Sequence, residues 1–209
     1  MTDTFENLNK AAFPGVGMYD TPIIQPLLDV PACEFIPFSI ALKCRNKTDK
    51  GVHFFIDDYR FKRIWTQPDR YLEMLSGFEY VLSPDFSMYP DMPLSMQIYN
   101  HYRKHWLATY WQAHGIKVIP TICWADQSSF DWCFDGEPRH STVAVSSVGC
   151  GVILEAKGGF RAGYEEMLRR LEPETILFYG SVPDGIADDD RIVHIEPYYK
   201  SVRKRAEAV

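Results

Sequence analysis

The sequence predicts an α/β fold built on a mostly parallel sheet of six or seven strands. Short apolar runs alternate with helical segments from residue 51 to the end of the chain. These runs are continuous, which is typical of strands covered on both faces in a parallel sheet. Two architectures fit this pattern: a small or incomplete barrel of the triosephosphate-isomerase kind, and an open doubly wound sheet. A full eightfold barrel needs about 250 residues, and this chain has 209.

The predicted strands are apolar runs bounded by turn residues. They cover residues 34–43, 51–58, 79–87, 116–123, 142–148, 174–180 and 191–197. Helical segments are expected at 60–78 with a break at Pro68, at 93–113, within 127–138, at 158–173 and after 197. Gly77 and Gly115 are placed to end the first two. Residues 1–32 carry scattered Pro and Gly, so we expect an N-terminal arm with one short helix, followed by a single α/β domain over residues 33–209.

The composition is that of an ordinary soluble domain, with 46% hydrophobic and 24% charged residues. The N-terminus has no signal-peptide pattern and no apolar segment approaches the length of a membrane span, so the sequence predicts a cytoplasmic protein without a membrane partner. Five cysteines with no CxxC pair favour a reducing compartment and argue against a disulfide framework or a structural zinc site.

The formal net charge of −6 disfavours general binding to nucleic acid, which would need a local basic patch. The chain offers two such patches, one in the segment YRFKR and one near the C-terminus. They comprise Arg60, Lys62 and Arg63, and Lys200, Arg203, Lys204 and Arg205. Basic stretches of this length are more often solvated helix ends.

Polar and aromatic residues follow the predicted strands, where α/β folds place their binding sites. Carboxylates there could divide into a proton donor and a base, or hold a divalent cation, while aromatic rings could form the wall of a cleft. The candidate catalytic residues are Asp57, Asp58, Asp85, Asp126 and Glu196. The candidate substrate-binding residues are Trp124, Tyr179 and Ser147.

The alternative is that these residues only mark where strands meet water, since Asp, Ser and Gly are common in turns. Asp57 and Asp58 are neighbours, so at most one of them faces a cleft. The sequence leaves open which one, and whether a metal is needed.

Three further patterns are incomplete. His101 and His105 lie four residues apart on one helix face and could bind a metal together, but the glutamate of an HExxH motif is missing, so packing or solvent exposure is the expected role. The glycine-rich segment GCGVILEAKGGFRAG (149–163) could cradle a phosphate but matches no phosphate-binding motif. Cys150 could be a nucleophile only beside a histidine, with His140 and His194 as candidates.

The segments GVHFFIDDYRFKRIW, YVLSPDFSMYPDMP, NHYRKHWLATYWQAHGIKVIPTICWAD and ILFYG give the chain a recognisable pattern. Over residues 35–197 it resembles a family of domains of unknown function found in bacteria, phages and plasmids. The resemblance implies a protein associated with mobile elements, and it carries no catalytic residue over to this chain.

Two functions therefore stay open. The first is a hydrolase-like enzyme with a carboxylate-lined cleft at the strand ends, acting on a sugar or phosphate ester. The second is a non-catalytic protein that binds a host protein, a nucleic acid or a small nucleotide-like ligand. Four acids converging in one pocket would favour the enzyme, whereas scattered acids and a basic or apolar patch would favour the binder.

Overall fold

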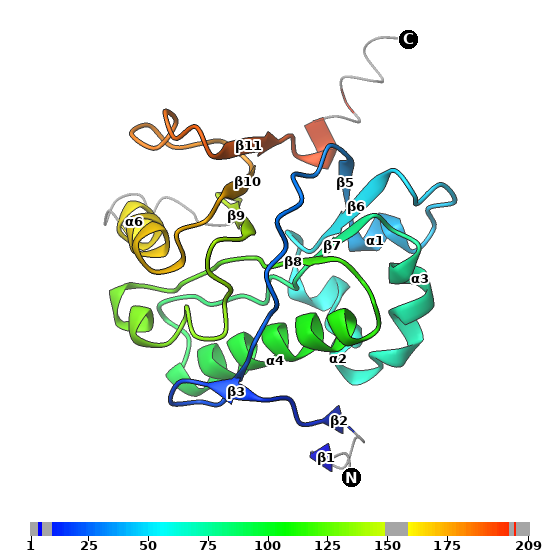
Figure 1. The fold of residues 1–209 in the computed structure, drawn as a ribbon, viewed down its shortest axis with the longest axis horizontal. Coiled ribbons are helices and arrows are strands. Elements are labelled where there is room, and N and C mark those ends of the chain that lie inside the picture. The colour runs from blue at the N-terminus through cyan, green and yellow to red at the C-terminus, as the bar shows by residue number, and fades with distance from the viewer. Residues whose placement is uncertain (1–3, 6–9, 149–158, 201–202, 204–209) are drawn as a thin grey trace.

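Parallel strands form two neighbouring sheets in the computed structural model of the chain, which describes residues 4–5, 10–148, 159–200 and 203 (Figure 1). The first sheet has the order β5 (Glu34–Pro37), β6 (Lys50–His53), β7 (Tyr80–Leu82) and β8 (Val118–Ile119). The second consists of β9 (Thr142–Ser146), β10 (Thr175–Tyr179) and β11 (Ile192–Ile195), with β10 in the middle. All pairings within these two sheets are parallel, as the sequence predicts.

A parallel bridge links the two sheets at their facing edges. Thr121, just beyond β8, pairs with Ala144 of β9. The amide of Ile122 donates to the carbonyl of Ala144, and the amide of Ala144 donates to the carbonyl of Pro120, both at 2.8 Å. The strands therefore follow one another in chain order from β5 to β11. No hydrogen-bonded pairing joins β11 to β5 among the described residues, so the described strands form no closed barrel.

The two faces of the strands meet different partners. One face forms a cluster, here called the inner cluster, made of strand residues and residues just beyond strand ends: Phe35, Phe55, Tyr80, Leu82, Ile119, Ala144, Leu177 and Tyr179. The other face packs against helices. Val52 and Val81 lie in a cluster with Trp111 of α4, and Val143 and Ile176 lie in a cluster with Met167 of α6.

Two of the helices in the described part of the chain are long, and the others are short. The short ones are α1 (Phe38–Ala41), α2 (Arg63–Thr66) and α3 (Leu72–Ser76), with 3-10 turns η1 (Asp58–Arg60), η2 (Asp69–Tyr71) and η3 (Gln127–Asp131). The long ones are α4 (Leu94–Ala113) and α6 (Gly159–Leu171). Gly115 follows α4 with φ +78°, the left-handed conformation in which glycine is favoured and which ends a helix.

Helix α4 buries polar side chains as well as apolar ones. Trp106, Leu107 and Trp111 pack into the apolar cluster behind the first sheet. His101, Lys104 and His105 are also buried, although their side chains are polar. Such groups need partners within the protein, because burying an unpaired polar group is costly.

Two sequence predictions are corrected and one is confirmed. The strand expected at 34–43 stops at Pro37, which has no amide hydrogen for the strand ladder, and α1 begins directly after it. The break expected at Pro68 within 60–78 is confirmed, since α2 ends before it and α3 follows it, and Gly77 is the residue that ends α3, with an ordinary φ of −77°. Within residues 10–32 there is no helix, but a small antiparallel pair, β3 (Gly15–Val16) with β4 (Thr21–Pro22).

The N-terminal arm also contributes β2 (Lys10–Ala11), which pairs with β1 (Thr4–Phe5). It then runs along the molecule from α4 to the sheets (blue in Figure 1). The indole of Trp106 donates to the carbonyl of Ala11 at 2.7 Å, and the amide of Thr142 donates to the carbonyl of Leu27 at 2.8 Å. The arm therefore connects α4 with the beginning of β9.

Candidate functional site

A pocket of about 100 Å³ opens at the carboxyl ends of β7, β8 and β9. Its lining combines aromatic and apolar side chains with a few polar ones. The lining residues include Phe55, Asp85, Ser87, Met88, Tyr89, Cys123, Trp124, Ser146 and Phe160. This is the edge at which α/β folds place their sites, and two of the candidate residues from the sequence, Asp85 and Trp124, lie in it.

Of the described residues that line this pocket, Asp85 is the only one with a carboxyl group, and it is half-buried. Burial raises the pKa of Asp85 to about 7, the nearby charge of Asp58 adds to the rise, and Lys104 and the Cys123 thiol oppose it. A carboxyl group with such a pKa exchanges its proton readily at neutral pH, which suits a general acid or base.

Asp58 lies close enough to Asp85 for its charge to act on that carboxyl group, but its own surroundings are different. It accepts hydrogen bonds from the hydroxyl of Ser87 at 2.9 Å and from the amide of Ser87 at 3.2 Å, and it lies 3.7 Å from the guanidinium of Arg103. Asp58 and Asp85 are therefore two acids in contrasting surroundings.

The aromatic walls are fixed by packing. Trp124 lies 5.4 Å from Phe160, ring centre to ring centre, and its indole covers Gly163 so closely that a Cβ there would come within 2.2 Å. Phe55 stacks on Tyr179 at 4.8 Å. Tyr179 therefore supports the pocket wall from behind, without lining the pocket itself.

The remaining candidates lie elsewhere. Asp57 is exposed and lies 3.4 Å from Arg60. Asp126 caps η3, accepting from the amide of Ser128 at 2.9 Å. Glu196 lines a separate groove between β11 and β5. Ser147 donates its amide to the carbonyl of Tyr179, while its neighbour Ser146 lines the pocket.

Sequence reasoning missed Lys104, whose ammonium group is fully buried beside the pocket. It donates to the carbonyl of Thr121 at 3.0 Å and to Glu137 at 2.6 Å, and lies 3.8 Å from the sulfur of Cys123. Burial alone would lower the pKa of Lys104, but the neighbouring Cys123 and the carboxylate of Glu137 together outweigh it and the pKa is raised. A lysine in the middle of a helix carries no signal of such burial, since its partners lie 17 and 33 residues further along the chain.

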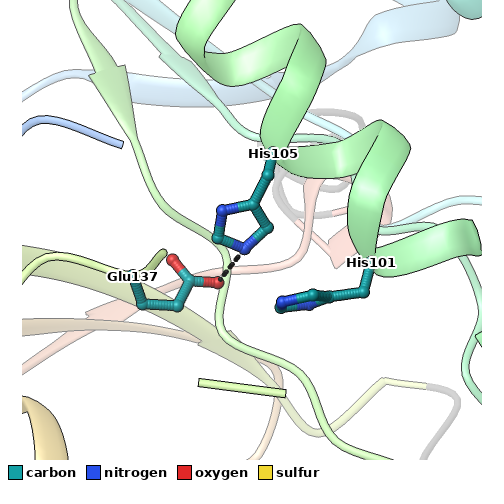
Figure 2. A group of neighbouring side chains, drawn as sticks. All are labelled: His101, His105 and Glu137. Atoms are coloured by element: carbon teal, nitrogen blue, oxygen red, sulfur yellow. Dashed lines mark hydrogen bonds and ion pairs between the residues drawn. The ribbon is translucent and has the colours of Figure 1, made fainter. Parts of the chain in front are cut away.

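Beyond Lys104 lies a buried polar cluster of His101, His105 and Glu137 (Figure 2). Of the described residues, only these form a group of three His, Cys, Asp or Glu whose ligand atoms could hold a metal ion. The strand-end carboxylates form no such group within the part of the chain that the structure describes. Cys150 and most of the glycine-rich segment 149–163 lie outside the described residues. None of the helices described is long and apolar enough to cross a membrane.

These features define an α/β protein with a small, partly aromatic pocket at the carboxyl ends of its parallel strands. Residues 13–198 match the family model DUF4417, a domain of unknown function, and the chain belongs to this family. The resemblance seen in the sequence is thus confirmed, and the matched region also includes most of the N-terminal arm.

The curated relatives of the chain are phage proteins. It is 38% identical over 197 residues to the Gene 1 protein of Mycobacterium phage D29, covering 93% of this chain and 72% of the relative. It is 38% identical over 186 residues to the Gene 1 protein of Mycobacterium phage L5, covering 85% and 79%. No solved structure matches the chain.

Proposed function

We propose that the chain is a phage-associated enzyme that acts on a small planar molecule in the Asp85 pocket, with Asp85 as its general acid or base. The observation that carries this proposal is the position of Asp85, a half-buried carboxyl group against Cys123 and beside the rings of Phe55 and Trp124 at the strand carboxyl ends. The curated relatives support the phage association, since both come from phages.

The layering of the strands supports the location. Helices pack on one face of the strands, and the inner cluster lies on the other. We infer an incomplete barrel rather than a doubly wound sheet, which would carry helices on both faces. In a barrel the loops that follow the strands meet at one rim, so a pocket between β7, β8 and β9 occupies the usual position of a catalytic site.

The size and lining of the pocket suggest the kind of substrate. A cavity of roughly 150 Å³ lined by apolar side chains is known to hold a benzene molecule, so a pocket of about 100 Å³ that opens to solvent suits one small ring with the rest of the molecule outside. A carboxyl group that can donate or accept a proton would bind the polar edge of such a ring. Hydrolysis is the proposed reaction, with Asp85 activating water or protonating the leaving group.

A ligand screen tests this proposal. Purified protein would be incubated with nucleobases, nucleosides, monosaccharides and their phosphate esters, and melting temperature and product mass would both be followed. We expect a compound that raises the melting temperature and is converted, with a rate that changes around pH 7. Asp85→Asn should abolish conversion while Asp126→Asn, which changes only the η3 cap, should not. Conversion that survives in Asp85→Asn would contradict the proposal.

A second candidate function is docking of a partner protein, favoured by the apolar side chains exposed around the start of α4. Leu94 and Met96 are 52% and 51% exposed, and Tyr89 and Tyr99 are 49% and 42% exposed. If docking is the function, the screen should find compounds that bind without being converted, or no compound that binds. Replacing Leu94 and Met96 with Ser should then abolish capture of the partner without changing the melting temperature.

A further inference from the structure

We propose that His101, His105 and Glu137 bind one divalent transition-metal ion of the zinc type in the interior of the protein. The site is distinct from the Asp85 pocket, since none of the three residues lines it. It brings together the turn of α4 that carries both histidines and the segment that follows η3 (Figure 2).

The geometry of the three side chains suits a metal. His101 and His105 are one helical turn apart, and their ring centres lie 4.3 Å from each other. The carboxylate of Glu137 approaches both rings from the opposite side (Figure 2), and one ligand atom from each of the three lies within 4.8 Å of the other two. Two imidazoles and one carboxylate form a ligand set that zinc uses in proteins.

The outer nitrogen atoms of both rings have main-chain partners. His105 Nδ1 lies 2.9 Å from the carbonyl of Pro22, and His101 Nε2 lies 3.2 Å from the carbonyl of Asp135. Carbonyl oxygen only accepts, so these nitrogens carry the hydrogens. Metal-binding histidines typically donate their other ring N–H to such a group. The nitrogen atoms left for the metal are then His105 Nε2 and His101 Nδ1.

Without an ion, the polar atoms of the cluster are poorly satisfied. His101 Nδ1 and Glu137 Oε2 are buried with no hydrogen-bond partner among the described residues, and their residues are 2% and 8% exposed. His105 Nε2 lies 3.0 Å from Glu137 Oε1, so two acceptors face each other. A second proton on His105 would repair only that contact. One metal ion can use both nitrogens and the carboxylate, and buried polar atoms in native proteins are rarely left unpaired.

Lys104 sets the class of metal. Its ammonium group lies 2.6 Å from Glu137 Oε1 and leaves Oε2 without a partner. Hard cations such as Mg²⁺ and Ca²⁺ depend on several oxygen ligands, and here a single carboxylate is shared with an ammonium group. Metals that bind imidazole nitrogen strongly, such as Zn²⁺, Ni²⁺ and Co²⁺, fit better.

The packing around the site supports a structural role for the metal. Gly136 lies so close to His105 that a Cβ would come within 2.9 Å of Nδ1, and its φ of +76° also favours glycine. The three ligands are buried, so a substrate has no access to the ion. A bound ion would fasten the segment after η3 to α4, and through the contact of His105 with Pro22 it would also fasten the N-terminal arm.

The test begins with the wild-type protein. After removal of metal with a chelator, Zn²⁺ and Co²⁺ would be titrated in, and metal content, melting temperature and the visible spectrum of the Co²⁺ form would be measured. We expect one ion per chain, a higher melting temperature with either metal, and a Co²⁺ spectrum without the charge-transfer band of a thiolate ligand. A chain that binds no ion in this one-to-one ratio would overturn the proposal, whatever the behaviour of any variant.

Substitutions locate the site. Loss of a group that only positions a metal ligand weakens metal binding roughly 10- to 100-fold, so His101→Gln and Glu137→Gln, which remove a ligand itself, should each weaken Zn²⁺ binding by more. His114→Gln is the matched control, because His114 follows the same helix and is exposed. Undiminished binding in both His101→Gln and Glu137→Gln, or a thiolate band in the Co²⁺ spectrum, would assign the ion to another site and overturn the proposal.

Discussion

The carboxyl group of Asp85 shows how a residue in a common turn sequence acquires unusual chemistry. It follows β7 in the run Ser83-Pro84-Asp85, which would be unremarkable at the end of any strand. Its pKa departs from the ordinary value because the fold buries it and places Asp58 nearby. These neighbours come from other segments of the chain, so the sequence could suggest the residue but not its proton affinity.

Asp85→Asn is predicted to stabilise the protein more at pH 8 than at pH 5. The folded-state pKa of about 7 lies above the unfolded value of about 3.9, so the folded form binds the proton more tightly. Tighter proton binding adds to the free energy of unfolding at low pH. This contribution, at most about 4 kcal/mol, is fully present below pH 4 and is lost as the pH rises through 7. Asparagine removes this dependence.

The measurement is thermal unfolding of both proteins at pH 5 and pH 8. Asp57→Asn is the control, because that side chain is exposed and lies beside Arg60. An equal difference between wild type and Asp85→Asn at the two pH values would show that the carboxyl group is not buried as described.

The candidate site could be predicted only in part from the sequence, because its side chains are brought together from distant segments of the chain. Asp85 and Trp124 were identified because strand ends converge in a parallel sheet, and both line the pocket. The rule that sites lie at the carboxyl ends of strands says nothing about local hydrogen bonds. Asp126, which caps η3, was therefore an equally good candidate by that rule. The buried partners of Lys104 are distant in sequence, and no periodic pattern signals them.

In the metal-free protein, Lys104→Met is predicted to be strongly destabilising, because it leaves the carboxylate of Glu137 buried without the ammonium group that neutralises it. Breaking a buried ion pair from one side costs about 3–5 kcal/mol. Adding Glu137→Gln to Lys104→Met should recover a large part of this loss, since the unpaired charge is then gone. Chemical denaturation of the two single variants and the double variant measures the coupling. Additive effects of the two substitutions would indicate that the groups do not interact.

At the scale of single elements, α6 shows how a helix can position a pocket residue. It is amphipathic, and Tyr164, Met167 and Leu171 pack toward the second sheet. The role of Gly163 was not predicted. It lets the indole of Trp124 lie directly against the helix backbone, which holds this ring in the pocket wall.

Gly163→Ala is therefore predicted to destabilise the protein even though alanine favours a helix. The gain in helix propensity is about 1 kcal/mol, whereas forcing a Cβ into a packed position costs typically 1–3 kcal/mol. The new Cβ would lie 2.2 Å from two atoms of the Trp124 ring, so either the ring or the helix must move. Denaturation compared with Ala162→Gly, an exposed position in the same helix, separates the two effects. A more stable Gly163→Ala protein would mean that the ring is free to shift.

Element boundaries were less predictable than element types. The apolar segment 34–43 continues smoothly from strand to helix, and only Pro37 marks the change. The arm has no periodicity of its own because long-range contacts hold it, such as those of Asp29 with Tyr80 at 3.0 Å and with Lys117 at 2.8 Å. Local sequence patterns cannot predict contacts between residues so far apart in the chain.

At the scale of the whole molecule, the question is whether the two sheets behave as one unit. The bridge at Thr121 and Ala144 joins their edges, and the inner cluster contains Leu82 of the first sheet and Leu177 of the second. The arm adds contacts to both, since Asp29 reaches Tyr80 while Leu27 reaches Thr142. These connections agree with the single domain that the sequence predicts for residues 33–209, which stays a prediction.

Unfolding is therefore predicted to be a single cooperative transition. Ile36→Ala lies in β5 of the first sheet and Ile176→Ala in β10 of the second, and both side chains are almost fully buried. Each substitution should lower stability by about 2–5 kcal/mol. If the sheets share one core, each should shift the whole transition, followed equally by circular dichroism and by tryptophan fluorescence. Two separated transitions, with each substitution moving only one of them, would show instead that the sheets unfold independently and that the inner cluster does not couple them.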